Sequence, residues 1–261
     1  MVKHFLPDIF GRSAGGDMFS SLQREIDQVF RDFGRGWPAV GAARNGFMAV
    51  KFNVAETDKA VEVTADMPGF SRGRNLHKIG QHAQDTAELF FENVRVPVSH
   101  RLGDENKGFV QVMHGFDFSR SLIGLQCLAV ARVALEETWE YITQRQAFGQ
   151  PLSAFQGVTH PLAQFDTEVE GARLVCLQGL WLKDQDLPHT AEAGMAKWWG
   201  PKLAYDVIHQ CLLCYGHGGY DRGLMGQRLR DVLGFQIGDG TAQIMKTIIA
   251  RTRAGRKNVP A

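Results

Sequence analysis

The chain has 261 residues, and its 29 Lys and Arg residues nearly balance its 28 Asp and Glu residues, which leaves a formal net charge of +1. This length fits one large domain or two small ones. A net charge so close to zero argues against nucleic acid or an acidic membrane as the main partner.

Residues 1–13 contain no long apolar core and no small-residue cleavage site, so we expect no signal peptide. No uninterrupted apolar run is long enough to span a bilayer, and four cysteines in a chain of this size do not indicate a disulfide scaffold. We therefore expect a cytoplasmic protein without a membrane partner.

The first part of the chain shows weak patterns. Apolar residues recur at helical spacing over residues 19–33, which predicts one amphipathic helix, and residues 34–46 have the Gly- and Ala-rich composition of a linker. Residues 48–54 and 61–65 alternate apolar and other side chains around a polar turn at 57–59, which predicts two strands. We expect this N-terminal segment to be loosely ordered.

A long helix follows. Residues 122–135 are apolar nearly all round, as expected for the central helix of a bundle. The helix should extend to Arg145, and Asp104 can cap its start near Glu105.

Two more helices are predicted downstream. Ser153 and Gln156 have capping-box spacing, so the second helix should start there, and Pro161 should kink it or move its start. Thr190 can cap a third helix, in which the Gly-Pro pair at 200–201 predicts an irregularity.

Asp239 is the most informative residue of the chain. It precedes a Gly-Thr turn at 240–241, and residues 241–255 have the pattern of a last helix, so we expect a mainly α fold with an antiparallel helix bundle. The turn can direct the carboxylate into a cleft, where helix-start amides can also face a ligand. Taken alone, a helix N-cap aspartate is the simpler interpretation.

Several segments resemble acyl-CoA dehydrogenases, in the order that this family has them. Residues 239–244 resemble its E-G-T-x-Q-I element, with Asp239 in the place of the Glu that acts as the catalytic base. Residues 89–97 resemble the strand that leaves its middle β-domain, residues 145–149 its R-x-x-F-G motif, and residues 155–156 its F-Q pair. The resemblance implies the C-terminal helical bundle domain of the family.

The start of the chain instead resembles a bacterial small heat-shock protein. The segments that carry this resemblance are residues 17–19, 22–25, 53–59 and 67–69. Together, the two resemblances imply a heat-shock-like fragment at 1–70, a remnant of the dehydrogenase middle β-domain at 71–103 and the helical domain at 104–261. Whether such a fusion is natural, a chimeric assembly or a deliberate design stays open.

The acyl-CoA dehydrogenase resemblance implies α,β-desaturation of an acyl-CoA thioester with FAD as the cofactor. A carboxylate removes the α-proton while the β-hydrogen leaves as hydride to the flavin, and the N–H of the base residue helps to polarise the thioester oxygen. Asp239 would fill both roles. Family members that act on alicyclic thioesters carry Asp here, which favours a cyclic or branched acyl group. An electron-transfer flavoprotein is the implied electron-transfer partner.

The same resemblance implies FAD contacts across the subunit interface of a homo-oligomer. Arg145 and Phe148 would contact the pyrophosphate and the adenosine half, and Gln156 would lie beside them. Thr241 and Gln243 would contact the flavin through hydroxyl, amide and helix-start N–H groups. For Arg145, a surface arginine at a helix end is the alternative.

Two more predicted contacts have competing interpretations. Asp117 and Arg120 match the family's D-x-x-R contact with acyl-CoA, but an i,i+3 ion pair on a helix explains them nearly as well. Gly216 keeps a glycine of the flavin-binding Q-x-x-G-G-x-G-[FY] element. Leu213 replaces its Gln and His217 its second Gly, which weakens the predicted flavin contact of Gly216.

A zinc site is the alternative interpretation of His209, Cys211, Cys214 and His217. Four ligands so close in sequence cannot easily enclose a tetrahedral ion, so we expect core cysteines and no metal.

Two other functions stay open for the whole chain. The heat-shock-like segment could make it a chaperone-like or interaction protein. It could also be a catalytically inactive fusion, because the segments that cover the flavin ring in the dehydrogenase family have no counterpart in this sequence.

Overall fold

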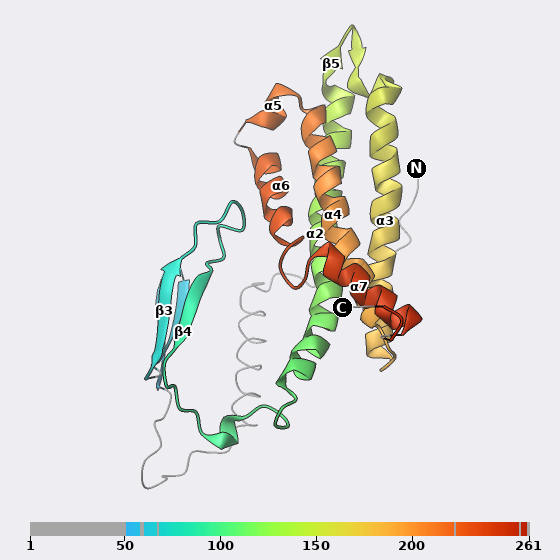
Figure 1. Ribbon diagram of the computed structural model, residues 1–261. Coiled ribbons are helices and arrows are strands. Elements are labelled where there is room, and N and C mark those ends of the chain that lie inside the picture. The colour runs from blue at the N-terminus through green and yellow to red at the C-terminus, as the bar shows by residue number, and fades with distance from the viewer. Residues whose placement is uncertain (1–50, 58–59, 67, 222, 256, 260–261) are drawn as a thin grey trace, which may run out of the picture. The chain divides into compact units, whose positions relative to one another are not determined.

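The computed structural model describes residues 51–57, 60–66, 68–221, 223–255 and 257–259 (Figure 1). By its internal contacts the chain forms two compact units, Met1–Asp66 and Met67–Ala261. The helix predicted at 19–33 and the linker predicted at 34–46 lie outside the described residues.

The first unit contains an antiparallel strand pair, β1 (Lys51–Thr57) and β2 (Ala60–Asp66). Lys51 lies opposite Asp66 and Thr57 lies opposite Ala60. Two strands are therefore present as predicted, but the first continues to Thr57 instead of ending at residue 54, and residues 48–50 lie outside the described residues.

The second unit begins with another antiparallel pair, β3 (Phe70–Asn75) and β4 (Ala87–Phe91). β3 was not predicted, because its sequence contains a glycine and lacks apolar alternation. The loop between the two strands is tied to helix α6 (Leu224–Gly234), since the Gln81 backbone N–H donates a hydrogen bond of 2.6 Å to Asp231 Oδ1.

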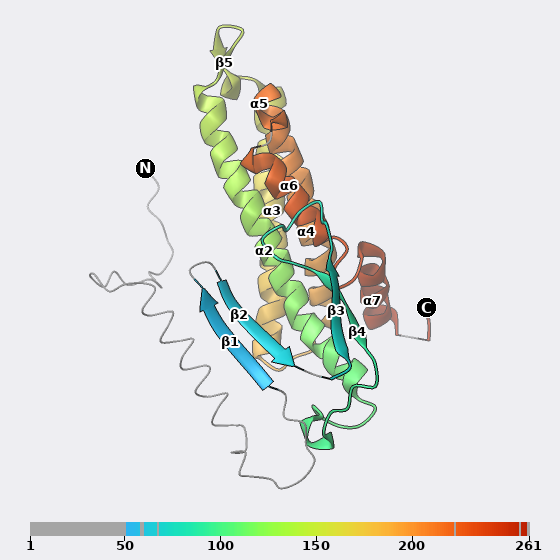
Figure 2. The same ribbon diagram turned by 90° about the vertical axis from the view of Figure 1, so that its left-hand side faces the viewer.

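The rest of the second unit is the predicted helix bundle. Its long helices α2, α3 and α4 lie side by side and alternate in direction, as Figures 1 and 2 show. The helices are α2 (Gly108–Gln144), α3 (Gln156–Asp184), α4 (Thr190–Cys214), α5 (His217–Tyr220), α6 (Leu224–Gly234) and α7 (Ala242–Ala254). The short elements are η1 (Val98–His100), β5 (Gln146–Ala147), β6 (Gln150–Pro151) and η2 (Leu152–Ala154).

Two predicted helix starts are two to three residues too early. α2 begins at Gly108 and not near Glu105, because Asn106 adopts a left-handed φ of 63°, which a helix cannot continue through. α3 begins at Gln156 with no side-chain cap, and Ser153 lies in the 3-10 turn η2 that precedes it. α3 starts ahead of Pro161 and runs through it.

Two glycines meet where α4 packs against α2. A Cβ atom on Gly200 would lie 2.8 Å from the Cα atom of Gly124, so the backbones of α4 and α2 approach each other more closely than side chains would allow. α4 is continuous through Gly200 and Pro201, so an irregularity at this pair does not end the helix. Gly200 serves helix packing instead.

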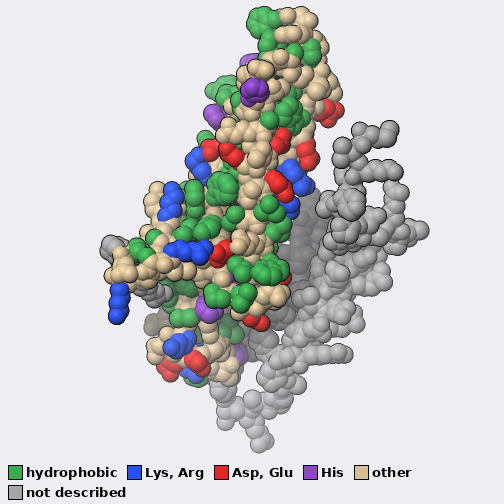
Figure 3. Space-filling view, turned by 90° about the vertical axis from the view of Figure 1, so that its right-hand side faces the viewer, with side chains coloured by type: hydrophobic (Ala, Val, Ile, Leu, Met, Phe, Trp, Pro, Cys, Tyr) green, Lys and Arg blue, Asp and Glu red, His purple; other side chains and the backbone are tan. Residues whose placement is uncertain are grey.

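α2 is the central element of the core. It supplies buried residues such as Cys127, Leu128 and Leu135 to the contacts with α3 and α4. By length and composition alone it would also pass as a membrane-spanning helix, a test that the core helix of a bundle passes as well. The bundle leaves apolar side chains at the surface as well, including Leu174 and Trp181 on α3, and Figure 3 shows such side chains along one face.

Candidate active site

Asp239 lies in the loop that joins α6 to α7. Its backbone has a φ of +56° and that of Gly240 a φ of +111°, both of which are left-handed values. Aspartate tolerates such a value better than most residues, and glycine suits Gly240 because a Cβ there would also lie 2.6 Å from Met245 Cε. The predicted turn is formed, and Thr241 rather than Asp239 is the N-cap of α7.

The carbonyl groups of this loop are bound by two buried cations. Lys197 Nζ donates to the Phe235 carbonyl at 2.6 Å and to the Gly240 carbonyl at 3.0 Å. Arg120 Nε donates to the Asp239 carbonyl at 3.2 Å. The loop therefore turns its oxygens toward α2 and α4.

The N–H groups of Asp239, Gly240 and Thr241, unlike the carbonyl groups of the loop, have no recorded hydrogen-bond partner among the described residues. The first N–H groups of α7 follow directly, and helix-start amides have no partner inside their helix. Such a run of unpaired donors is suited to an anion or to a carbonyl oxygen that gains negative charge.

The carboxylate of Asp239 is held from α2. Ser119 Oγ donates a hydrogen bond of 3.0 Å to Asp239 Oδ2. The side chain is partly buried. One oxygen is thus oriented by the protein, and the other has no recorded partner among the described residues.

Asp117 and Arg120 form a buried network beside this loop. Arg120 Nη1 lies 3.0 Å from Asp117 Oδ1, and Thr190 Oγ1 donates to Asp117 Oδ2 at 2.6 Å. The i,i+3 pair considered above is therefore present, and it also links α2 to the start of α4 and to Asp239. A direct contact of either residue with a substrate stays a prediction.

Lys197 and Ser119 were not predicted as functional residues. Lys197 is only 1% exposed, and burial lowers the pKa of its ammonium group while the Asp239 carboxylate opposes that shift. The available signal was positional: Lys197 shares the buried helical stripe of Ala193, Gly200 and Ala204.

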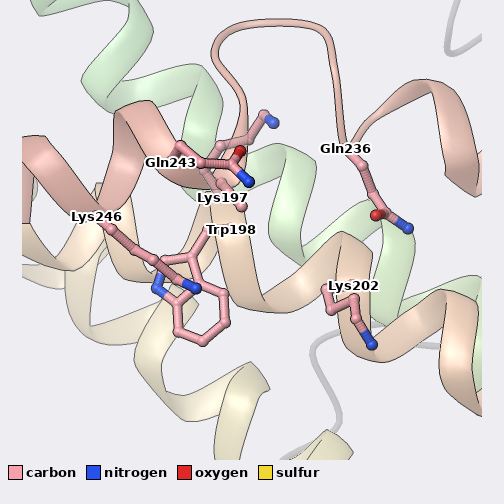
Figure 4. A pocket seen from close by; sticks show the side chains of 7 residues that line it. Lys197, Trp198, Lys202, Gln236, Gln243 and Lys246 are labelled. Atoms are coloured by element: carbon pink, nitrogen blue, oxygen red, sulfur yellow. The ribbon is translucent and has the colours of Figure 1, made fainter.

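A pocket of about 300 Å³ lies between α4 and the start of α7. Its lining includes Gln243, one of the predicted flavin contacts, but not Asp239. Lys202 and Lys246 line it too, and Lys246 Nζ lies 4.5 Å from the centre of the Trp198 ring (Figure 4). Ammonium groups beside helix-start amides fit a diphosphate.

The other predicted cofactor residues lie at the far end of α2. Arg145 and Gln156 are exposed, and Phe148 is 96% exposed on the turn between β5 and β6. The stretch of α2 from Ser119 to Arg145 is roughly 40 Å long at the rise of an α-helix. The predicted site residues therefore form two separate groups.

Gly216 belongs to this far group. It has a left-handed φ of 57° and precedes α5, and the neighbouring Tyr215 ring stacks on Tyr141 near the end of α2. Leu213 and His217 are exposed here. The structure thus places the altered glycine element at the same end as Arg145.

The cysteines belong to the core of the bundle. Cys127, Cys176 and Cys211 are buried, and burial raises the pKa of Cys127 and Cys176 to about 12 and that of Cys211 to about 11. Among the described residues, no three His, Cys, Asp or Glu side chains are grouped to hold a metal ion.

The family profile described as "Acyl-CoA dehydrogenase, C-terminal domain" matches residues 106–253. The chain belongs to the acyl-CoA dehydrogenase family. The heat-shock-like fragment has no comparable support.

Individual relatives agree with this assignment. The mitochondrial long-chain specific acyl-CoA dehydrogenase of Sus scrofa is 35% identical over 96% of this chain and 63% of its own length. The cyclohexane-1-carbonyl-CoA dehydrogenase of Geobacter metallireducens is 35% identical over 72% and 50%. The CarC subunit of the caffeyl-CoA reductase–Etf complex of Acetobacterium woodii is 32% identical over 70% and 48%. The chain thus spans about half to five-eighths of these relatives.

Solved structures of acyl-CoA dehydrogenases share the fold. The acyl-CoA dehydrogenase of Geobacillus kaustophilus superposes with a TM-score of 0.69 at 36% identity, over 77% of this chain and 56% of that one. Butyryl-CoA dehydrogenase of Megasphaera elsdenii superposes with a TM-score of 0.70 at 30% identity, over 78% and 55%. Acyl-CoA dehydrogenases are flavin-dependent oxidoreductases, and the predicted mainly helical fold is confirmed.

Proposed function

We propose that this chain takes part in the α,β-desaturation of an acyl-CoA thioester, with Asp239 as the catalytic base. The observation that carries the proposal is the loop at 239–241, where an oriented carboxylate lies beside a run of unpaired N–H groups. The carboxylate takes the α-proton from the substrate. The Asp239 N–H donates to the thioester oxygen, on which negative charge develops as that proton leaves.

FAD is the cofactor that we propose for this site. When bound, it would accept the β-hydrogen together with its electron pair. Thr241 and Gln243 at the start of α7 would hold it with helix-start N–H groups, and Lys202 and Lys246 suit the charge of its diphosphate. The residues that enclose the flavin ring would have to come from a part of the acyl-CoA dehydrogenase fold that this chain does not match.

We propose a cyclic or branched acyl group as the substrate class. Aspartate is one methylene shorter than glutamate, so productive geometry needs an α-carbon that comes closer to the backbone. The Geobacter metallireducens relative is named for a cyclic thioester. Exchange of Asp239 for Glu should therefore slow turnover of cyclohexanecarboxyl-CoA more than that of butyryl-CoA. Equal slowing of both would contradict this substrate class.

The partners follow from the two groups of site residues. Arg145, Phe148 and Gln156 lie far from Asp239, so we propose that they contact the FAD of a second copy in a homo-oligomer. An electron-transfer flavoprotein is the proposed electron acceptor, and the Acetobacterium woodii relative is a subunit of a complex with such a protein. The heat-shock-like origin of residues 1–70 also stays a proposal.

The visible absorption spectrum tests this function. The purified chain is mixed with FAD, alone and together with a separately expressed polypeptide that carries the N-terminal and middle domains of a relative. A yellow complex that desaturates an acyl-CoA supports the proposal. A colourless protein that suppresses aggregation of a client protein in both settings would replace it with the chaperone alternative.

A further inference from the structure

Lys197 is a buried charge to which the proposed reaction gives no role. Its side chain is 1% exposed in the middle of α4, where an ammonium group loses its hydration. No ion pair with a carboxylate is recorded for it in the described part of the chain. Its recorded hydrogen bonds go to two carbonyl groups of the Asp239 loop.

Those two hydrogen bonds fix the orientation of peptide planes. A trans peptide bond points its C=O and its N–H in opposite directions, and no cis bond is recorded among the described residues. With the Gly240 carbonyl on Lys197, the Thr241 N–H points away from α4. With the Asp239 carbonyl on Arg120, the Gly240 N–H points away from that side chain.

We propose that Lys197 is a positioning residue that, together with Arg120, sets two peptide planes of the loop so that the N–H groups of Gly240 and Thr241 face the substrate beside the Asp239 carboxylate. The proposal rests on the function proposed above. Lys197 also lines the pocket beside the start of α7, and it acts on the reaction through the two loop carbonyl groups that it binds. It holds both ends of the loop at once, since Phe235 and Gly240 lie on either side of Asp239.

The competing explanation is that the lysine only fills space. Its side chain is 1% exposed on a face of α4 with other buried residues, and an apolar side chain of similar length would fill the same volume. Replacement of a buried charge by an apolar group of similar shape is often neutral or stabilising for the fold. Lys197→Met should therefore keep the bundle while leaving the two carbonyl groups without a donor.

The two hydrogen bonds from Lys197 to the loop carbonyl groups are called the clamp below. Hydrogen exchange measured by mass spectrometry tests the clamp without flavin or substrate. In Lys197→Met, the hydrogen-bonded amides of residues 235–238 and of Met245 should exchange roughly tenfold faster or more, with those of residues 122–142 unchanged. Lys197→Gln, which keeps a donor, should give a smaller change. Arg132→Met, which removes an exposed cation on α2, is the matched control and should change neither segment. Unchanged exchange in the loop, or an equal rise throughout the bundle, overturns the clamp.

Chemical rescue distinguishes a side chain that donates hydrogen bonds from one that only fills space. In Lys197→Ala, propylammonium should restore slow exchange in the loop, whereas 1-propanol of similar size should not. Equal rescue by both would show that space filling is the role. In an assembly that turns over acyl-CoA, Lys197→Met should lower kcat with KM nearly unchanged, and propylammonium should restore kcat in Lys197→Ala. If no assembly shows turnover, the proposed function fails while the exchange data still decide the clamp.

Discussion

The two ends of helix α2 differ in how their polar residues are held. At the Asp239 end, Asp117, Ser119 and Arg120 bind one another or the α6–α7 loop, and all three are at least partly buried. At the other end, Arg145 and Phe148 face solvent. The first group is already organised within one chain. The second group is left at the surface of the isolated chain.

The largest effect on the reaction rate is expected at the Asp239 end of α2, which is called the organised end below. Asp239→Asn should lower the rate of desaturation by on the order of a hundredfold to ten-thousandfold, because an amide cannot accept the α-proton. Asparagine tolerates the left-handed backbone and can still accept the hydrogen bond from Ser119, so flavin binding and folding should persist. The rate is measured in the complemented assembly described above. An undiminished rate would assign the base to another residue.

Removal of Arg120 tests whether the organised end is also structural. Arg120→Met leaves the Asp117 carboxylate buried without its cation, and breaking such a pair typically destabilises a protein by about 3–5 kcal/mol. Urea unfolding of the chain without cofactor measures this. The double variant Arg120→Met with Asp117→Leu should recover most of the loss, because it leaves no buried charge unpaired. A loss below about 1 kcal/mol in the single variant would contradict a buried structural pair.

How well the sequence predicted these features depends on how far apart the interacting residues lie along the chain. The turn at 239–241 and the start of α7 were predictable because Asp, Gly and Thr encode left-handed backbone and a helix cap within three residues. The roles of Lys197 and Ser119 were not, because their partners lie 38 to 43 and 120 residues away. A lysine on a buried stripe signals an internal partner without identifying it.

The contact between α2 and α4 beside the organised end should be sensitive to one methyl group. Gly200→Ala places a Cβ 2.8 Å from the backbone of Gly124, and overpacking of this kind usually destabilises by about 1–3 kcal/mol. Gly157→Ala on α3 is the matched control, since its Cβ meets nothing within 4 Å, and it should stabilise by about 0.5–1 kcal/mol. Thermal unfolding of both variants distinguishes them. Equal shifts in Tm would mean that α2 and α4 can move apart at Gly200 and accommodate the added methyl group without loss of stability.

The smallest effect on the isolated chain is expected at the exposed end. Phe148→Ala should change the free energy of unfolding by less than about 0.5 kcal/mol, because the side chain is 96% exposed and its one recorded ring contact is with Phe155. The same variant should weaken FAD binding or oligomer formation, measured by flavin absorption and sedimentation velocity, if the exposed end completes a site on a second copy. Asp239→Asn should leave both of those quantities unchanged. A Phe148 variant that unfolds the chain would mean that the turn between β5 and β6 is structural. One that leaves FAD binding and assembly intact would remove this end of α2 from the cofactor site and leave the Asp239 loop as the whole of it.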